Sequence, residues 1–219
     1  MLASQLIFST YPSIDIDDSI RFAIQLMEDY EVLHLPVVND EKFAGVASKD
    51  DLLDLDENLS IKAAHLELNK VSVSGKDHFL NAVRLCNEHH LTVIPVITQQ
   101  QELQGLITLQ DLVRAMALYH SVEEEGGLIV LEMDKRSYSF GEINRLVETN
   151  DAHIVQLNTY TDKETGMFMV AFKINKYEVS DVVSTFQRYE YTIKYYFGEE
   201  LYENELKENF DQLMNYLKM

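Results

Sequence analysis

The first half of the chain contains an internal repeat, which constrains the fold more than any other feature of the sequence. A shift of 59 residues places Ile14 on Val73 and aligns two sets of apolar residues with i, i+3, i+4, i+7 spacing. This spacing is that of the apolar face of an amphipathic helix. The two sets are Ile20, Ala23, Ile24 and Met27 in one copy and Phe79, Ala82, Val83 and Cys86 in the other. The same shift aligns Leu35-Pro36-Val37-Val38 with Ile94-Pro95-Val96-Ile97, which predicts one short buried strand per copy.

The alignment of the two copies changes by one residue at a place that a structural repeat tolerates. Beyond the buried strand the shift becomes 60, and it then places Gly45, Ser48, Asp51 and Leu52 on Gly105, Thr108, Asp111 and Leu112. The extra residue falls in a polar turn between two apolar strands, and hairpin tips accept insertions. Each copy therefore predicts the order strand, helix, strand, turn, strand, helix. One copy is too small to bury its own sheet, so we expect the two copies to pack on each other.

The second half of the chain follows a break in this pattern. A charged stretch at 122–125 and the glycine pair at 126–127 indicate a domain boundary. Beyond it, the apolar alternation predicts strands at 128–133, 154–160, 168–174 and 191–197, and helices that begin near 139 and 179. This βαββαβ order is the ferredoxin-like arrangement. The last segment, 199–219, predicts a helix that docks either on its own domain or on a partner. Its apolar face is Tyr202, Leu206, Phe210, Leu213 and Leu217.

Two stretches of the first half carry a family pattern: apolar-Pro-Val-apolar, a turn, and then Gly-apolar-apolar-Ser/Thr-x-x-Asp-Leu. Residues 9–55 and 68–117 both match it, and this pattern resembles the CBS domain. The resemblance implies a tandem CBS pair, or Bateman module, over residues 1–122. After such a pair, residues 127–198 resemble an ACT domain, and the whole chain is similar to the CBS–ACT regulatory proteins grouped with acetoin-utilisation proteins. The expected fold class is α/β (α+β).

The repeated Ser/Thr-x-x-Asp motif predicts a site at the start of a helix in each copy. Hydroxyl groups and backbone N–H groups at a helix start suit a phosphate, and a carboxylate one turn later can accept hydrogen bonds from a ribose diol. The family resemblance implies that Ser48 and Thr108 contact phosphate and that Asp51 and Asp111 hold ribose. It also implies that residues around Ser13 and Ser72 border the adenine. The same motif is an ordinary N-terminal helix cap, which is the structural alternative.

The two predicted clefts differ in their basic residues. His34 precedes Leu35 where nucleotide-binding members of the family place a basic residue, whereas the second copy has Val93 there. Lys49 follows the hydroxyl residue in the first copy, and Leu109 is its counterpart. If one cleft alone is occupied, we expect it to be the one built around Ser48 and Asp51, on the assumption that each cleft draws on its own repeat.

The predicted function is that of a non-catalytic sensor that binds AMP, ADP, ATP or S-adenosylmethionine and relays binding to the ACT-like domain or a partner. One alternative is a ligandless scaffold that dimerises through the CBS pair, the ACT-like domain or both. We expect the ACT-like domain to dimerise by pairing sheets side by side. The second alternative is an amino-acid sensor, since ACT domains bind amino acids at the loop after the first strand. That loop, 134–141, lacks the family's Asp-x-x-Gly pattern.

Composition restricts the partners and the compartment. With 18 basic and 37 acidic residues, the formal net charge is −19, which disfavours nucleic acid and anionic lipid. The single cysteine, Cys86, cannot form an internal disulfide, and the first basic residue is Arg21, so no basic signal-peptide start is present. No apolar run approaches the ~20 residues that span a bilayer. We therefore expect a cytoplasmic protein without membrane insertion.

The sequence offers no motif for catalysis or for a metal site. The Gly-x-Ser-x-Gly, Walker and Gly-x-Gly-x-x-Gly patterns are absent, and no nucleophile–base pair stands out. The pair His89-His90 lacks a further ligand at metal spacing, so we expect a solvated helix end there. Cys86 lies on an apolar helix face and is expected to be a core residue. The chain is accordingly not expected to be an enzyme.

Overall fold

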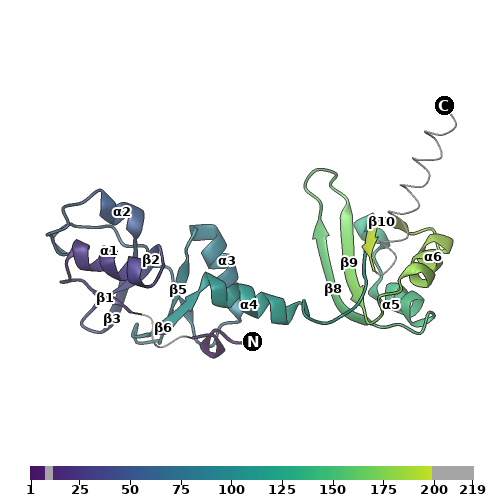
Figure 1. The fold of residues 1–219 in the computed structure, drawn as a ribbon, viewed down its shortest axis with the longest axis horizontal. Coiled ribbons are helices and arrows are strands. Elements are labelled where there is room, and N and C mark those ends of the chain that lie inside the picture. Colours follow the sequence, from purple (N-terminus) through teal and green to yellow (C-terminus); the bar gives the residue numbers. More distant parts are fainter. Residues whose placement is uncertain (8–11, 199–219) are drawn as a thin grey trace, which may run out of the picture. The chain divides into compact units, whose positions relative to one another are not determined.

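The two copies of the repeat form two three-stranded sheets with one topology. The structure is a computed structural model that describes residues 1–7 and 12–198 (Figure 1). The predicted helix at 199–219 lies outside the described residues. The first copy contains β1 (Ile14–Asp15), α1 (Ile20–Asp29), β2 (His34–Asn39), β3 (Lys42–Ser48) and α2 (Lys49–Leu53). The second contains β4 (Val73–Ser74), α3 (Phe79–His89), β5 (Val93–Ile97), β6 (Leu103–Thr108) and α4 (Leu109–Tyr119).

The strand registers reproduce both shifts of the sequence repeat. The strand β1 runs parallel to β2 with Ile14 opposite Val37, and β4 runs parallel to β5 with Val73 opposite Val96. Both antiparallel hairpins, β2–β3 and β5–β6, carry a β-bulge just after the residue that faces a glycine. These glycines, Gly45 and Gly105, share a φ of +151°, which favours glycine. The hairpin is therefore the same irregular structure in both copies.

The two copies pack on each other by exchanging a core side chain. Val93 of the second copy lies in the core of the first copy, with Leu35, and Val46 of the first copy lies in the core of the second, with Phe79. All four side chains are at most 3% exposed. The predicted packing of copy on copy is thus confirmed. The chain start also joins the second core: η1 (Ala3–Gln5) places fully buried Ala3 there, which the sequence analysis did not anticipate.

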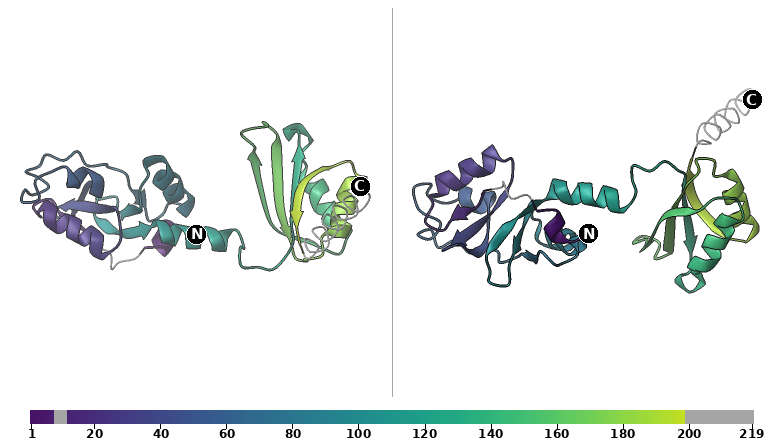
Figure 2. Two further views of the ribbon diagram at one scale, coloured as in Figure 1. Left: turned by 45° about the horizontal axis from the view of Figure 1, so that its top comes forward. Right: turned by 90° about the horizontal axis from the view of Figure 1, so that it is seen from below.

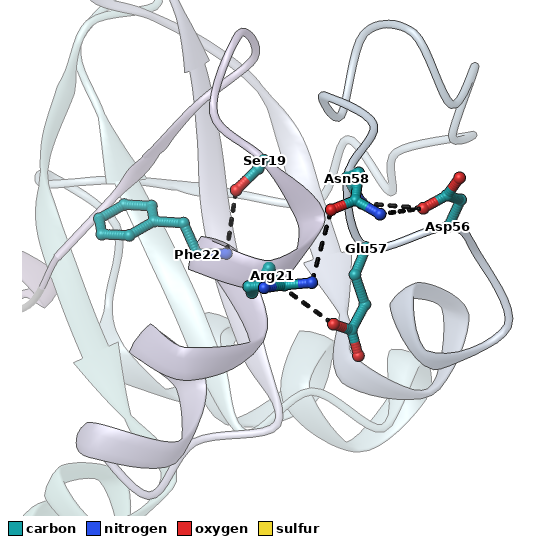
Figure 3. A network of polar contacts seen from close by, with 6 residues as sticks. All are labelled: Ser19, Arg21, Phe22, Asp56, Glu57 and Asn58. Atoms are coloured by element: carbon teal, nitrogen blue, oxygen red, sulfur yellow. Dashed lines mark hydrogen bonds and ion pairs between the residues drawn. The ribbon is translucent and has the colours of Figure 1, made fainter.

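A polar network fixes the start of α1. The hydroxyl of Ser19 accepts a hydrogen bond from the backbone N–H of Phe22 at 3.2 Å, as its N-cap position predicts (Figure 3). Arg21 pairs with Glu57 at 3.3 Å and donates to Asn58 at 3.4 Å. The backbone and side-chain amides of Asn58 donate in turn to Asp56, and they lower the pKa of that carboxyl. The network joins α1 to the segment after α2, although its exposed ion pair adds little stability.

The second unit is a four-stranded antiparallel sheet with two helices on one face. The chain divides into compact units between Met116 and Ala117. The second contains β7 (Leu128–Met133), η2 (Lys135–Ser137), α5 (Phe140–Glu148), β8 (Ile154–Thr161), β9 (Phe168–Ile174), α6 (Ser180–Arg188) and β10 (Thr192–Phe197). The strand order is β10-β7-β9-β8, and α5 and α6 lie together on one side of it (Figure 2). These elements have the predicted ferredoxin-like order.

Neither a membrane span nor a metal cluster is found in the described part of the chain. Over residues 1–7 and 12–198, no helix has both the length and the apolar composition that crossing a bilayer requires. Within the same ranges, no group of three or more His, Cys, Asp or Glu side chains is arranged to hold a metal ion.

Candidate functional site

We call the N-terminal end of α2 the first helix entrance and the N-terminal end of α4 the second. At the first entrance, the hydroxyl and the carboxylate of the motif make no capping hydrogen bonds. His34 on β2 lies opposite Ser48 at the end of β3. Ser48 is the N-cap residue of α2, yet its side chain makes no capping hydrogen bond. Asp51, one turn on, is exposed. The first copy therefore brings together the predicted residues His34, Ser48, Lys49 and Asp51, and over residues 1–7 and 12–198 the side chains of Ser48 and Asp51 make no capping hydrogen bond.

At the second helix entrance, the two motif residues are hydrogen-bonded to each other. The Thr108 hydroxyl donates to Asp111 Oδ2 at 2.5 Å, and the Thr108 backbone N–H donates to the same oxygen at 3.2 Å. The backbone N–H of Asp111 donates back to the Thr108 hydroxyl at 3.1 Å, and Arg114 pairs with Asp111 Oδ1 at 3.1 Å. Both Thr108 and Asp111 are buried. This reciprocal pattern is a capping arrangement, and a contact of Thr108 or Asp111 with a nucleotide stays a prediction.

His34 ties the two copies together. Its Nδ1 accepts hydrogen bonds from the backbone N–H of Thr92 at 3.3 Å and from the Thr92 hydroxyl at 3.1 Å. The Thr92 hydroxyl accepts from the backbone N–H of Leu33 at 3.2 Å, and Leu33 and Thr92 are equivalent residues of the repeat. Burial lowers the pKa of His34, although Asp50 and Asp51 act against this shift. Burial therefore favours the neutral form of His34, and a contact of His34 with a nucleotide stays a prediction.

This environment predicts a pH dependence of stability. The unfolded chain, with a histidine pKa near 6.5, binds the proton more readily than the folded chain. The stability contributed by neutral His34 is thus complete above pH 6.5 and is lost as the pH falls through the lower pKa of the folded state. We expect the free energy of unfolding, measured by urea denaturation, to fall more steeply with acidification in the wild type than in His34→Gln. Equal slopes in the two proteins would contradict this role.

Lys49 is held at the entrance by an ion pair. Its Nζ lies 3.0 Å from Glu28 Oε1 of α1, and the lysine side chain is 22% exposed. Its backbone N–H donates to Leu33 O at 2.8 Å, just as Leu109 N–H donates to Thr92 O at 2.9 Å in the second copy. The first helical N–H of each copy is therefore already bonded, and the lysine charge is shared with Glu28.

Ser13 and Ser72 occupy equivalent places in the two copies. Each immediately precedes the short strand, β1 or β4, that runs parallel to the central strand of its sheet. Ser13 is exposed and Ser72 is half-buried. Their role at an adenine ring stays a prediction.

A cavity of about 300 Å³ lies at the second entrance and draws on both copies. The second copy contributes Thr92 and the segment 108–110, and the first copy contributes the segment 30–32 after α1. Its volume is at the lower limit for ligand pockets. Of the eight predicted site residues, Thr108 alone lines it. The assumption that each cleft draws on its own repeat therefore does not hold here. The sequence analysis missed segment 30–32, because a repeat alignment gives no information on which copy covers which entrance.

A second cavity, of about 470 Å³, lies in the second unit beside the loop after β7. Four of its ten lining residues are acidic, and one of them, Glu132, forms an ion pair with Lys194 at 2.7 Å. Burial and a hydrogen bond to Glu142 raise the pKa of Tyr191, which also lines this cavity, to about 12. The other acidic lining residues are Asp134, Glu142 and Glu190. This lining opposes the carboxylate of a free amino acid and attracts its ammonium group, so the amino-acid sensor stays a prediction.

Comparisons with known proteins match part of the chain. The sequence model of the CBS domain family matches residues 3–58 and 66–118. The inosine-5'-monophosphate dehydrogenase of Bacillus subtilis is 22% identical over 166 residues, which cover 73% of this chain and 34% of the relative. The chain spans about a third of the length of the curated relatives it matches. The activity of those relatives therefore says nothing direct about this chain.

Solved structures give the same result. A CBS domain pair/ACT domain protein from Thermotoga maritima is 26% identical, with a TM-score of 0.50, and the match covers 54% of this chain and 98% of that one. The structure of CBSX2 in complex with AMP is 22% identical, with a TM-score of 0.48, and covers 54% of this chain and 97% of that one. The family model ends at residue 118, so the likeness of the second unit to an ACT domain stays a prediction.

Proposed function

We propose that this chain is a non-catalytic regulatory protein that binds an adenine nucleotide at the first helix entrance. The premise is that residues 3–58 and 66–118 form a CBS domain pair. The nucleotide is AMP, ADP, ATP or S-adenosylmethionine. The observation that carries the proposal is the contrast between the copies: Thr108 and Asp111 are bonded to each other, whereas the Ser48 side chain makes no capping bond and Asp51 is exposed. The same motif thus serves as a cap in one copy and remains open to a ligand in the other.

The symmetry of the repeat supplies the rest of the first site. The cavity at the second entrance is walled by segments 108–110 and 30–32. The two shifts convert these segments into 48–50 and 89–91, so we infer an equivalent cleft between the first entrance and the end of α3. Glu31 at the second entrance corresponds to His90 at the first. The covering segment of the first entrance therefore places a histidine where that of the second entrance places a carboxylate, which repels a phosphate.

In this site the Ser48 hydroxyl donates to the phosphate, and Asp51 accepts hydrogen bonds from the ribose hydroxyls. Hydrogen bonds to a charged group contribute about 1.5–3 kcal/mol, so Asp51→Ala should raise Kd about tenfold to a hundredfold. The matched control is Asp111→Ala, because the Asp111 carboxylate already accepts a hydrogen bond from the Thr108 backbone N–H at the start of α4. This variant should lose about 1 kcal/mol of stability and keep its nucleotide affinity.

A thermal-shift panel tests the proposal. At a nucleotide concentration near 100 times Kd, binding stabilises the folded state by about 2.7 kcal/mol. The melting temperature of the first unit should then rise by on the order of 10 °C with one of the four nucleotides. Asp51→Ala should remove most of the rise and Asp111→Ala should retain it. A flat response to all four nucleotides would instead favour the ligandless scaffold.

The remaining parts of the proposal concern assembly and place. We propose that the chain is a cytoplasmic homodimer that relays nucleotide binding from the CBS pair to the second unit or to a partner. Relay requires that the nucleotide favours one arrangement of the units over another. The binding-dependent change can be measured by small-angle scattering with and without nucleotide.

A further inference from the structure

The ion pair between Lys49 and Glu28 has no charged equivalent in the second copy. Lys49 is the first residue of α2, and its Nζ lies 3.0 Å from Glu28 Oε1 near the end of α1. The repeat shifts of 59 and 60 convert these two residues into Asn87 and Leu109, which carry no charge. The pair is therefore a feature by which the two helix entrances differ, and the common structure of the repeat does not require it.

Two cavities of the second copy show what position 49 faces. One is the cavity of about 300 Å³ at the second helix entrance, and the other, of about 420 Å³, is lined mainly by residues of α3 and α4. Leu109 lines both cavities, whereas Asn87 lines the one between the helices and not the one at the entrance. The repeat therefore places Lys49 at the border between the first helix entrance and α1, with Glu28 on the α1 side.

We propose that Glu28 controls the phosphate affinity of the first helix entrance by competing for the ammonium group of Lys49. This inference rests on the proposed function, because it needs a nucleotide at that entrance. A lysine ammonium group is a point charge on a flexible four-carbon stem, so it can change partners without a movement of the backbone. When a phosphate binds beside Ser48, Lys49 exchanges the carboxylate for the phosphate. Nucleotide binding then removes the ion pair that joins α1 to α2.

This competition affects ligands that carry a phosphate. The phosphate contact has to replace the ion pair, so removal of the Glu28 charge should raise the affinity for AMP, ADP or ATP. Glu28 is 53% exposed, and an exposed ion pair changes an equilibrium by about 1.4-fold to fivefold. S-adenosylmethionine carries no phosphate, so the same substitution should give it no gain.

Equilibrium dialysis with four versions of the full chain tests the competition. They are the wild type, Glu28→Gln, Lys49→Leu and the double variant, and Lys49→Leu introduces the residue type that the second copy has at this position. Glu28→Gln should lower the Kd of the bound nucleotide about twofold to fivefold, and Lys49→Leu should raise it several-fold. In the Lys49→Leu background, Glu28→Gln should leave Kd unchanged, because the ammonium group for which it competes is gone.

The matched control is Glu57→Gln. Glu57 is 55% exposed and pairs with Arg21 at 3.3 Å, so its exposure and its type of partner resemble those of Glu28. This pair belongs to the network at the start of α1, whereas Glu28 lies near the end of that helix. The control changes the net charge of the chain by the same amount and should leave Kd unchanged.

Four outcomes would overturn the inference. An equal gain from Glu28→Gln with and without Lys49→Leu would show that the glutamate repels the phosphate directly. Nucleotide binding that neither single substitution changes would show that the pair only holds α1 to α2, and the proposed function would stand. Binding of S-adenosylmethionine alone would leave no phosphate to compete for. Absence of binding of all four nucleotides in every version of the chain would refute the proposed function together with the inference.

Discussion

Substitution Gly126→Ala is expected to destabilise the second unit by about 3–5 kcal/mol, which is a large part of the 5–15 kcal/mol that holds a typical domain together. Gly126 has a φ of +151°, and a β-carbon there would lie 1.9 Å from the carbonyl oxygen of Ile174. That oxygen belongs to the backbone at the end of β9 and cannot rotate away as a side chain could. The neighbouring residue, Gly127, accepts a hydrogen bond from Ile174 N–H at 2.9 Å, so the two segments are fixed together.

The matched control for this glycine is Gly141→Ala. A β-carbon at Gly141 would meet nothing within 4 Å, and the residue is the second of α5. Alanine favours a helix over glycine by about 0.5–1 kcal/mol, so this variant should be slightly more stable than the wild type. Urea denaturation followed by circular dichroism measures both effects. A loss of less than about 1 kcal/mol for Gly126→Ala would contradict the packing of residue 126 against β9.

Substitution Phe186→Ala should destabilise the same unit by about 3–5 kcal/mol, because it removes the aromatic centre of the core between the helices and the sheet. Phe186 is fully buried, with its ring 5.5 Å from that of Phe172 and 5.3 Å from that of Tyr191. The control is Phe140→Ala, at the first position of α5, where the side chain is 52% exposed and the loss should stay below about 0.5 kcal/mol.

Scanning calorimetry distinguishes this effect from a general loss of stability. The two units have separate cores, so the transition of the second unit should move down while that of the first unit stays in place. A shift of both transitions by the same amount would show that the units unfold as one. Equal effects of Phe186→Ala and Phe140→Ala would contradict the assigned core.

The fold of the first half could be predicted because the repeat appears as a local periodicity of apolar residues. The two shifts, 59 and 60, correspond to the strand registers, and the extra residue falls in a hairpin turn, as predicted. Long-range packing carries no such signal. The burial of Ala3 in the second core and the exchange of Val46 and Val93 between the cores depend on how surfaces meet. A single sequence does not show which surfaces of the two copies come into contact.

A second sequence difference between the two helix entrances lies one turn beyond the motif. Arg114 pairs with Asp111 in the second copy, and a shift of 60 places Asp54 at the corresponding position of the first. A cation therefore completes the cap of α4, whereas a like charge follows Asp51. The motif residues themselves are equivalent, and the residue one turn further on differs in charge between the copies. The covering segment 30–32 could not be found in the same way, because it comes from the other copy.

Equilibrium dialysis of AMP, ADP, ATP and S-adenosylmethionine against the full chain measures binding at the first helix entrance, because it counts bound nucleotides without relying on stability. We predict saturation at one nucleotide per chain, about tenfold to a hundredfold weaker binding in Asp51→Ala and unchanged binding in Asp111→Ala. Two equivalent sites, binding that depends on Asp111 and not on Asp51, or no binding of any of the four would contradict it.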